Sequence, residues 1–254
     1  MARIARLLVG NTDRVPDLTY ATGLFVPDDF AWFQTPSGKT FTLLGPLEID
    51  RAHRTASVDQ CLDLSQEEKR LGPKKHSYPK LLTSALRRHG IRSAEIPSSF
   101  PIGLAQQLKR AGLRLRPIPE PFFPARLKKA PTEIRHIIQA IRAAEAGLTR
   151  AVEILRNSKV RKKNLLSWAG STLTSERLRT EMEIACLRHG ALARDTIVSG
   201  GQQACDPHER GHGPLRARQA IILDIFPRHS STGYFGDITR TVVKGQASEA
   251  LRHL

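Results

Sequence analysis

The chain has 254 residues, of which 40 % are hydrophobic and 25 % are charged, a composition typical of a folded globular protein and not of a disordered one. No apolar run approaches the roughly 20 residues that a helix needs to span a bilayer, and the amino-terminal segment lacks the long apolar stretch of a secretory signal. Three scattered cysteines are too few for a disulfide framework, so we expect a cytoplasmic protein.

The formal net charge of +16 would attract nucleic acid, an anionic membrane or a ribosome. The positive residues, however, come as short separated groups such as Lys74-Lys75 and Arg161-Lys162-Lys163. Aromatic residues, on which the bases of a single strand stack, make up only 6 % of the chain. The sequence therefore favours a solvated basic surface, and we do not expect a nucleic-acid partner.

Residues 1–125 alternate strand-like and helix-like segments and predict a small α/β domain. The predicted strands are residues 3–9, 19–26, both arms of a hairpin within 31–44, 91–95 and 113–119, and the predicted helices are residues 78–89 and about 100–111. The turn residues Pro36 to Lys39 separate the hairpin arms, and Gly90 and Gly112 follow the helices as stop signals.

The proline-rich stretch 117–124 marks the domain boundary, which we place between residues 125 and 126. Beyond it, Pro131 opens a long helix, and a second helix begins near Thr174 and ends at Gly190. The predicted apolar face of the long helix consists of Ile134, Ile137, Ile138, Ile141, Leu148, Val152 and Leu155. The predicted strands that follow are DTIVSGG (195–201), AIILDIF (220–226) and YFGDITRTVV (234–243).

Each of the last two strands carries one aspartate, Asp224 and Asp237. The apolar run around Asp224 predicts a strand that is buried on both faces, where an ionised carboxylate is costly. If the strands pair with the aspartates opposite each other, the carboxylates share one face about 5 Å apart. One carboxyl must then protonate or a divalent cation must bridge the pair. The alternative is that Asp224 caps a strand end and Asp237 pairs with Arg240.

A family resemblance is carried by the order of short motifs: SGG at 199–201, Pro-His at 207–208, Pro-Leu at 214–215, LDIF at 223–226 and GYFGDITRTVVKG at 233–245. This order resembles the pita-bread metallopeptidases, and most of all their Xaa-Pro branch, aminopeptidase P and prolidase. The resemblance implies a creatinase-type α/β domain in residues 1–125 and the amino-terminal half of an α+β pita-bread catalytic domain in residues 126–254. It also implies that Asp224 is a bidentate ligand of one metal, that Asp237 bridges two, and that His208 contacts substrate and stabilises the tetrahedral intermediate.

The implied activity is a metal-dependent exopeptidase that hydrolyses a peptide bond next to proline. Two divalent ions, Mn²⁺ by resemblance with Co²⁺ or Zn²⁺ as alternatives, would activate a water, and we expect a homodimer. The family completes its site with a histidine and two glutamates well downstream of the second aspartate, so we expect this chain to be truncated and inactive alone. The aspartates are thirteen residues apart, where the family usually has eleven, and the extra residues fall in the turn 228–232.

Other interpretations remain open. A non-catalytic pita-bread relative could bind RNA, a ribosome or a protein through its basic surface, and a metal-free creatinase-like hydrolase would need no aspartate pair. Cys205, His208 and His212 have zinc-like spacing but offer only three ligands, so a loop that carries a substrate-contacting histidine is the preferred interpretation.

Overall fold

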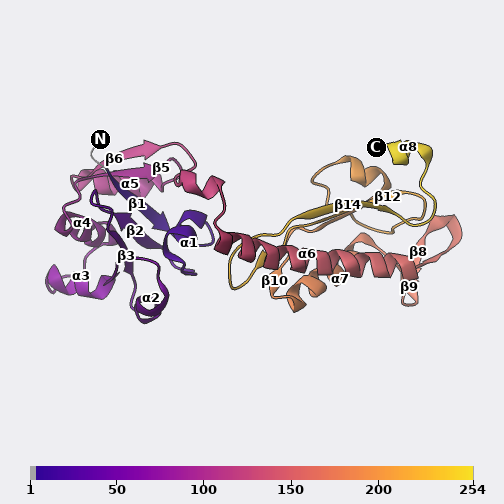
Figure 1. The fold of residues 1–254 in the computed structure, drawn as a ribbon, viewed down its shortest axis with the longest axis horizontal. Coiled ribbons are helices and arrows are strands. Elements are labelled where there is room, and N and C mark those ends of the chain that lie inside the picture. The colour runs from indigo at the N-terminus through magenta and orange to yellow at the C-terminus, as the bar shows by residue number, and fades with distance from the viewer. Residues whose placement is uncertain (1–3, 254) are drawn as a thin grey trace. The chain divides into compact units, whose positions relative to one another are not determined.

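The computed structural model describes residues 4–253 and divides the chain into two compact units, Met1–Lys128 and Lys129–Leu254 (Figure 1). None of the helices in this described range combines the length and the apolar composition that crossing a bilayer requires. The three cysteines are free thiols. Each unit has its own hydrophobic core and is described separately.

The first unit is built on a mixed six-stranded sheet with the strand order β4-β3-β2-β1-β5-β6. The strands are β1 (Ala5–Gly10), β2 (Phe30–Gln34), β3 (Thr40–Leu44), β4 (Gln60–Asp63), β5 (Ser93–Pro97) and β6 (Arg114–Ile118). The helices are α1 (Pro16–Thr22), α2 (Ile49–Thr55), α3 (Leu64–Arg70), α4 (Tyr78–Arg88) and α5 (Ile102–Arg110), followed by the 3-10 turn η1 (Pro124–Leu127). Strand β1 pairs antiparallel with β2 and parallel with β5, so β1 lies at the centre of the sheet.

Alternate residues of the central strands feed two separate cores. Leu7 and Phe33 belong to one core, with α4 and α5, while Leu8 and Trp32 belong to the other, with Phe122 from the end of the unit. This alternation is what a period of two along a strand produces when both faces of a sheet are covered. The predicted hairpin, both predicted helices and the strands at 93–97 and 114–118 are confirmed.

The prediction of a strand at residues 19–26 is wrong, because this segment contains the end of α1 and the loop after it. Pro16 starts the helix in its first turn, where a missing N–H costs nothing. Gly23 ends the helix in the left-handed region, with φ 67°, and its N–H donates to the Thr19 carbonyl at 2.8 Å. The apolar run was long enough for a strand, but the flanking proline and glycine decided the local structure.

The second unit packs two helices against one face of a three-stranded antiparallel sheet, with the strand order β11-β12-β14. Its main elements are α6 (Pro131–Asn157), α7 (Ser175–Arg188), β11 (Ile197–Gly200), β12 (Ala220–Ile225) and β14 (Ile238–Val243). Smaller elements are β7 (Lys159–Val160), η2 (Lys162–Asn164), β8 (Leu166–Trp168), β9 (Ser171–Thr172), β10 (Ala191–Leu192), η3 (Gly201–Cys205), β13 (Arg228–His229) and α8 (Glu249–His253). Helix α7 begins near Thr174 as predicted, and the Thr174 hydroxyl caps it by accepting from the Arg177 N–H at 3.3 Å.

The buried face of α6 matches the predicted face only in part. Leu155 is buried as predicted and Leu148 packs against the core, but Ile134 and Ile138 are 46 % and 42 % exposed. Apart from Ile154 and Leu155, the buried residues of the helix are small: Ala140, Ala143, Ala144, Gly147 and Ala151. A Cβ atom at Gly147 would lie 2.6 Å from Cδ1 of Ile225 and 2.9 Å from Sγ of Cys186. Small side chains therefore let α6 approach both α7 and β12, a requirement that hydrophobic periodicity does not reveal.

Candidate metal centre

The register of β12 and β14 places both predicted metal ligands on one face of the sheet. Asp224 lies directly opposite Thr239, and Ile225 lies opposite Ile238. Directly opposite residues of an antiparallel pair share a face, and faces alternate along each strand, so Asp237 shares the face of Thr239 and Asp224. The two aspartates are diagonal neighbours, a relation that separates Cα atoms by roughly 7–8 Å. The two aspartates are therefore offset by two residues along the paired strands, and the expectation that they lie directly opposite each other is wrong.

The face that carries the aspartates is not buried along β12 and β14, which corrects the expectation for AIILDIF, although Ile197 and Ser199 on its β11 side are buried. Ile221, Leu223 and Ile225 are buried, while the alternate residue Asp224 is partly exposed and Asp237 is exposed. Helices α6 and α7 lie on one side of the strands (Figure 1), and the buried residues point into that core. Both carboxylates therefore keep contact with water, and the desolvation cost inferred from the sequence does not arise.

Asp224 is held by a side-chain hydrogen bond within the sheet. The Thr239 hydroxyl donates to Oδ1 of Asp224 at 2.6 Å. Arg240 uses its guanidinium to donate to the Thr239 carbonyl at 2.8 Å, and within residues 4–253 it forms no ion pair with Asp237. Asp224 lies inside β12, so neither part of the alternative structural reading, a strand cap and an Asp237–Arg240 pair, is present.

The longer turn between the strands lies beyond the aspartates in the hairpin. The pairing that joins Ile225 to Ile238 continues without a shift, since the Gly236 N–H donates to the Pro227 carbonyl at 3.0 Å and the His229 N–H to the Tyr234 carbonyl at 2.9 Å. The extra residues therefore extend the hairpin beyond the aspartates. The hairpin is also attached to the first turn of α6, where the Tyr234 hydroxyl donates to Oε1 of Glu133 at 2.9 Å.

Gly236, the residue before Asp237, is required for the close approach of this strand to α6. A Cβ atom there would lie 2.5 Å from both the carbonyl carbon and the oxygen of Ala140, and 2.6 Å from N of Ile141. All three atoms belong to the helix backbone and cannot rotate away. The contact therefore fixes how far Asp237 stands from the helix layer.

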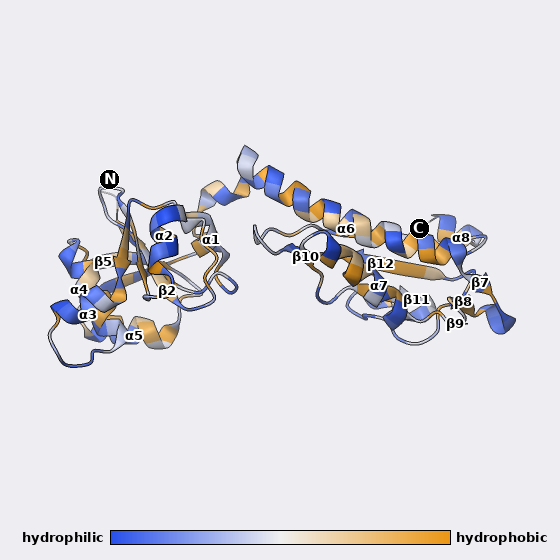
Figure 2. Cartoon of the chain, turned by 90° about the horizontal axis from the view of Figure 1, so that it is seen from below, coloured by the Kyte–Doolittle hydropathy of each residue, from blue (hydrophilic) through white to orange (hydrophobic). Residues whose placement is uncertain are grey.

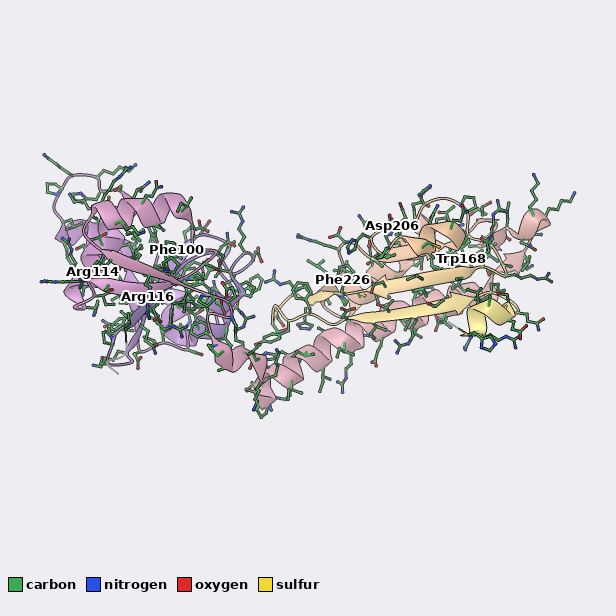
Figure 3. All side chains as sticks on the ribbon, turned by 90° about the horizontal axis from the view of Figure 1, so that it is seen from above. Phe100, Arg114, Arg116, Trp168, Asp206 and Phe226 are labelled. Carbon is green, nitrogen blue, oxygen red and sulfur yellow. The ribbon has the colours of Figure 1, made fainter. Side chains whose placement is uncertain are left out.

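His208 lies on the loop between η3 and β12, and it is exposed. The backbone N–H of His208 donates to Oδ1 of Asp206 at 3.1 Å. Figure 3 labels Asp206 on this loop and Phe226 just after β12. The Ser199 hydroxyl donates to the Glu209 carbonyl. The Val198 N–H donates to the Arg210 carbonyl at 3.0 Å, so the residues after His208 run beside the edge strand β11. Because Ser199 lies opposite Ile222, on the face of Asp224, the Glu209 carbonyl is on the aspartate-bearing side of that edge. Within the described residues, no contact joins His208 to either aspartate.

Helix α7 anchors this loop at two points that the sequence does not reveal. Arg179 donates to the Gly211 carbonyl at 2.7 Å, and Oε1 of Glu176 accepts from the Gly213 N–H at 3.0 Å. Hydrogen bonds from the Thr174 hydroxyl and from this amide hold the pKa of the Glu176 carboxyl below its usual range. The partners are more than thirty residues apart, so no local sequence signal could have identified them.

The described residues hold no group of three or more histidine, cysteine or acidic side chains placed to bind a metal. In particular, Cys205, His208 and His212 do not converge, and Nδ1 of His212 lies 3.6 Å from Glu209 instead. Asp224 and Asp237 thus stand as a pair of oxygen donors on an open face. Such donors suit a hard divalent cation, but two carboxylates leave most of its coordination sphere to water.

Comparison with solved structures shows the same fold along nearly the whole chain. An Xaa-Pro dipeptidase from Bacillus anthracis has a TM-score of 0.78 and 16 % identity, and the alignment covers 98 % of this chain and 62 % of that one. An X-Pro aminopeptidase from Thermotoga maritima has a TM-score of 0.78 and 16 % identity, with 100 % of this chain and 66 % of that one covered. The prolidase from Pyrococcus horikoshii OT3 has a TM-score of 0.75 and 20 % identity, with 99 % of this chain and 63 % of that one covered. The chain thus has this fold and spans about 62–66 % of the length of these relatives.

No curated protein sequence matches the chain. The sequence profile of metallopeptidase family M24 matches residues 135–254, which include nearly all of the second unit and both aspartate-bearing strands. The family resemblance read from the motifs is therefore confirmed by an independent comparison. Over residues 135–254 the chain is similar to metallopeptidase family M24.

Proposed function

We propose that the chain carries part of the catalytic machinery of an Xaa-Pro metallopeptidase, an exopeptidase that hydrolyses the peptide bond next to a proline. The observation that supports the proposal is the pair Asp224 and Asp237 on one open sheet face inside the segment that matches family M24. The finer architecture is part of the same proposal: a creatinase-type domain in residues 1–125 and half of a pita-bread domain in residues 126–254.

In this proposal Asp224 and Asp237 would hold the divalent ions through their carboxylate oxygens. Mn²⁺ is the proposed metal, with Co²⁺ or Zn²⁺ as alternatives, and when bound it supplies activation of a water and polarisation of the scissile carbonyl. Thr239 orients Asp224 through its hydrogen bond. His208, on the loop that precedes β12, would donate from its imidazole to the oxygen that becomes negative in the transition state.

The ligand set in this chain is partial, and this determines the activity that we expect. Two carboxylates bind a divalent ion weakly, and within residues 4–253 no third histidine, cysteine or acidic side chain joins them in a metal-binding group. We therefore propose that efficient hydrolysis needs ligands from polypeptide outside this sequence. A homodimer and a cytoplasmic location belong to the same proposal.

The test is a titration of the full chain with Mn²⁺. Binding is measured by calorimetry and by the electron paramagnetic resonance signal of the Mn²⁺ that remains free. Asp224→Asn and Asp237→Asn should each weaken binding, while Asp28→Asn, a matched change at an exposed aspartate of the first unit, should not. Equal binding by all four proteins would refute the assignment of the metal site. Robust turnover of an Xaa-Pro dipeptide by the purified chain would refute its predicted inactivity.

A further inference from the structure

One end of the second unit gathers positive side chains from three segments that are distant in sequence. We call this surface the basic end. It consists of Arg156, Lys159, Arg161, Lys162, Lys163, Arg216, Arg218 and Lys244. All are exposed except Arg216 and Lys244, which are partly exposed. Figure 2 shows strongly hydrophilic colour at this end, beyond β7 and β8.

Backbone hydrogen bonds bring the three segments together. The Ala217 N–H donates to the Asn164 carbonyl at 2.8 Å, and the Arg218 N–H donates to the Lys244 carbonyl at 2.9 Å. The Lys244 ammonium in turn donates to the Arg156 carbonyl, at the end of α6, at 2.7 Å. Charges that are separated into short groups along the sequence are therefore adjacent on the folded surface.

This surface is not neutralised by its own acidic residues. Residues 154–175, 210–223 and 238–248 contain no aspartate or glutamate. None of the eight side chains of the basic end forms an ion pair within residues 4–253, whereas elsewhere Arg88 pairs with Glu67 and Arg150 with Glu181. The nearby helix α8 contributes one acidic residue and one arginine, which cancel. The positive potential therefore acts outward, on solvent and on partners.

The tip of the β7–β8 hairpin displays two of these charges. Lys163 and Asn164 have φ values of 58° and 60°, an uncommon conformation for residues other than glycine. Two consecutive positive φ values are typical of a tight hairpin turn. Both Lys162 and Lys163 are exposed on this turn.

We propose that the basic end binds nucleic acid through its phosphodiester backbone. A closely spaced set of lysines and arginines without acidic neighbours matches the regular negative charge of that backbone. Base stacking does not contribute, since Arg150 and Arg177 each lie 5.5 Å from the ring centroid of Trp168, the aromatic residue of β8. Membrane binding is disfavoured, because Val160 is the exposed large apolar residue of these segments and a bilayer needs a broader apolar face.

The test is fluorescence anisotropy of the full chain with labelled oligo(U) RNA of about 20 nucleotides, at salt concentrations between roughly 50 and 200 mM. The variant Lys159→Gln, Lys162→Gln, Lys163→Gln removes three charges from the basic end. The control variant Lys74→Gln, Lys75→Gln, Lys80→Gln removes three exposed charges from the first unit. We expect the first variant to lose about tenfold or more in affinity, with the salt slope reduced by about two, and the control to change little.

Each other outcome overturns the proposal. Equal losses in the two variants would mean that net charge alone attracts the RNA. Absence of binding at the lowest salt would mean that the surface is only solvated. Tighter binding to vesicles of phosphatidylcholine and phosphatidylserine, lost in the same variant, would assign the surface to membranes. Oligo(dT) of equal length should bind as oligo(U) does, since no group on this surface is assigned to a base or to the 2′-hydroxyl. Mn²⁺ binding is expected to be unchanged in both variants, so this test is independent of the peptidase proposal.

Discussion

Replacement of Gly236 by alanine tests whether the contact between β14 and α6 positions the aspartate pair. The new Cβ atom would lie 2.5 Å from the carbonyl carbon and oxygen of Ala140. Ordinary carbon contacts are about 3.5–4.0 Å, so strand or helix must move by roughly 1 Å. No rotamer change can relieve the clash, because the atoms it meets are backbone atoms.

The expected destabilisation follows from this overpacking. Extra methyl groups in a close-packed interior typically cost about 1–3 kcal/mol, which is roughly a 5- to 150-fold increase in the equilibrium constant for opening of the second unit. The displacement would act on Asp237, the next residue, and should change its distance from Asp224. We therefore expect weaker Mn²⁺ binding together with the loss of stability.

Hydrogen exchange measured by mass spectrometry separates the two units and is the appropriate assay. Gly236→Ala should speed exchange of the β12 and β14 amides, while the first unit stays unchanged. Gly45→Ala is the matched control, because a Cβ atom at Gly45 meets nothing within 4 Å. If β12 and β14 remain as protected in Gly236→Ala as in the Gly45→Ala protein, the contact does not constrain the strand and our account of its role is incorrect.

Three further results are expected. Thr239→Val removes the hydroxyl that donates to Asp224 at 2.6 Å and should weaken Mn²⁺ binding a fewfold in calorimetry without loss of folding; unchanged affinity would show that this hydrogen bond does not orient the carboxylate. Burial lowers the pKa of His89, so the stability that its neutral form provides is complete above the unfolded pKa of about 6.5 and is lost as the pH falls. In urea titrations between about pH 8 and 5, the free energy of unfolding should therefore fall less in His89→Phe than in the unmodified protein. Burial raises the pKa of the Cys186 thiol to about 11, so a disulfide reagent at neutral pH should modify the exposed Cys205 and leave Cys186 unmodified until the protein unfolds.

Local signals in the sequence were sufficient for most elements of this fold. Pro131 and Thr174 mark helix starts through chemistry that acts within one turn, and the structure begins α6 and α7 where they indicate. Alternation and turn residues likewise identified the β2–β3 hairpin and the strands β12 and β14. The segment 19–26 failed because its apolar run is compatible with a strand, while the helix is imposed by Pro16 and Gly23.

Properties that depend on distant segments were not predictable in the same way. The apolar run of β12 does not determine whether one or both faces of the strand are covered, since that depends on where α6 and α7 pack. The register that offsets Asp224 from Asp237 depends on hairpin pairing that continues past Pro227 to His229. The basic end depends on hydrogen bonds across up to 88 residues of sequence. In each case the missing information was a tertiary contact.

The open face changes the physical argument for a metal at the aspartates. Buried carboxylates would have required a cation to offset the desolvation cost, so the metal would have been part of the fold. The core beneath the sheet instead consists of Leu223, Ile225 and their neighbours, and it is complete on the side away from the aspartates. The aspartates therefore create no desolvation cost that a metal would have to offset during folding. What supports a metal here is the shared face of Asp224 and Asp237 together with the family match, and both concern chemistry at the surface of the sheet.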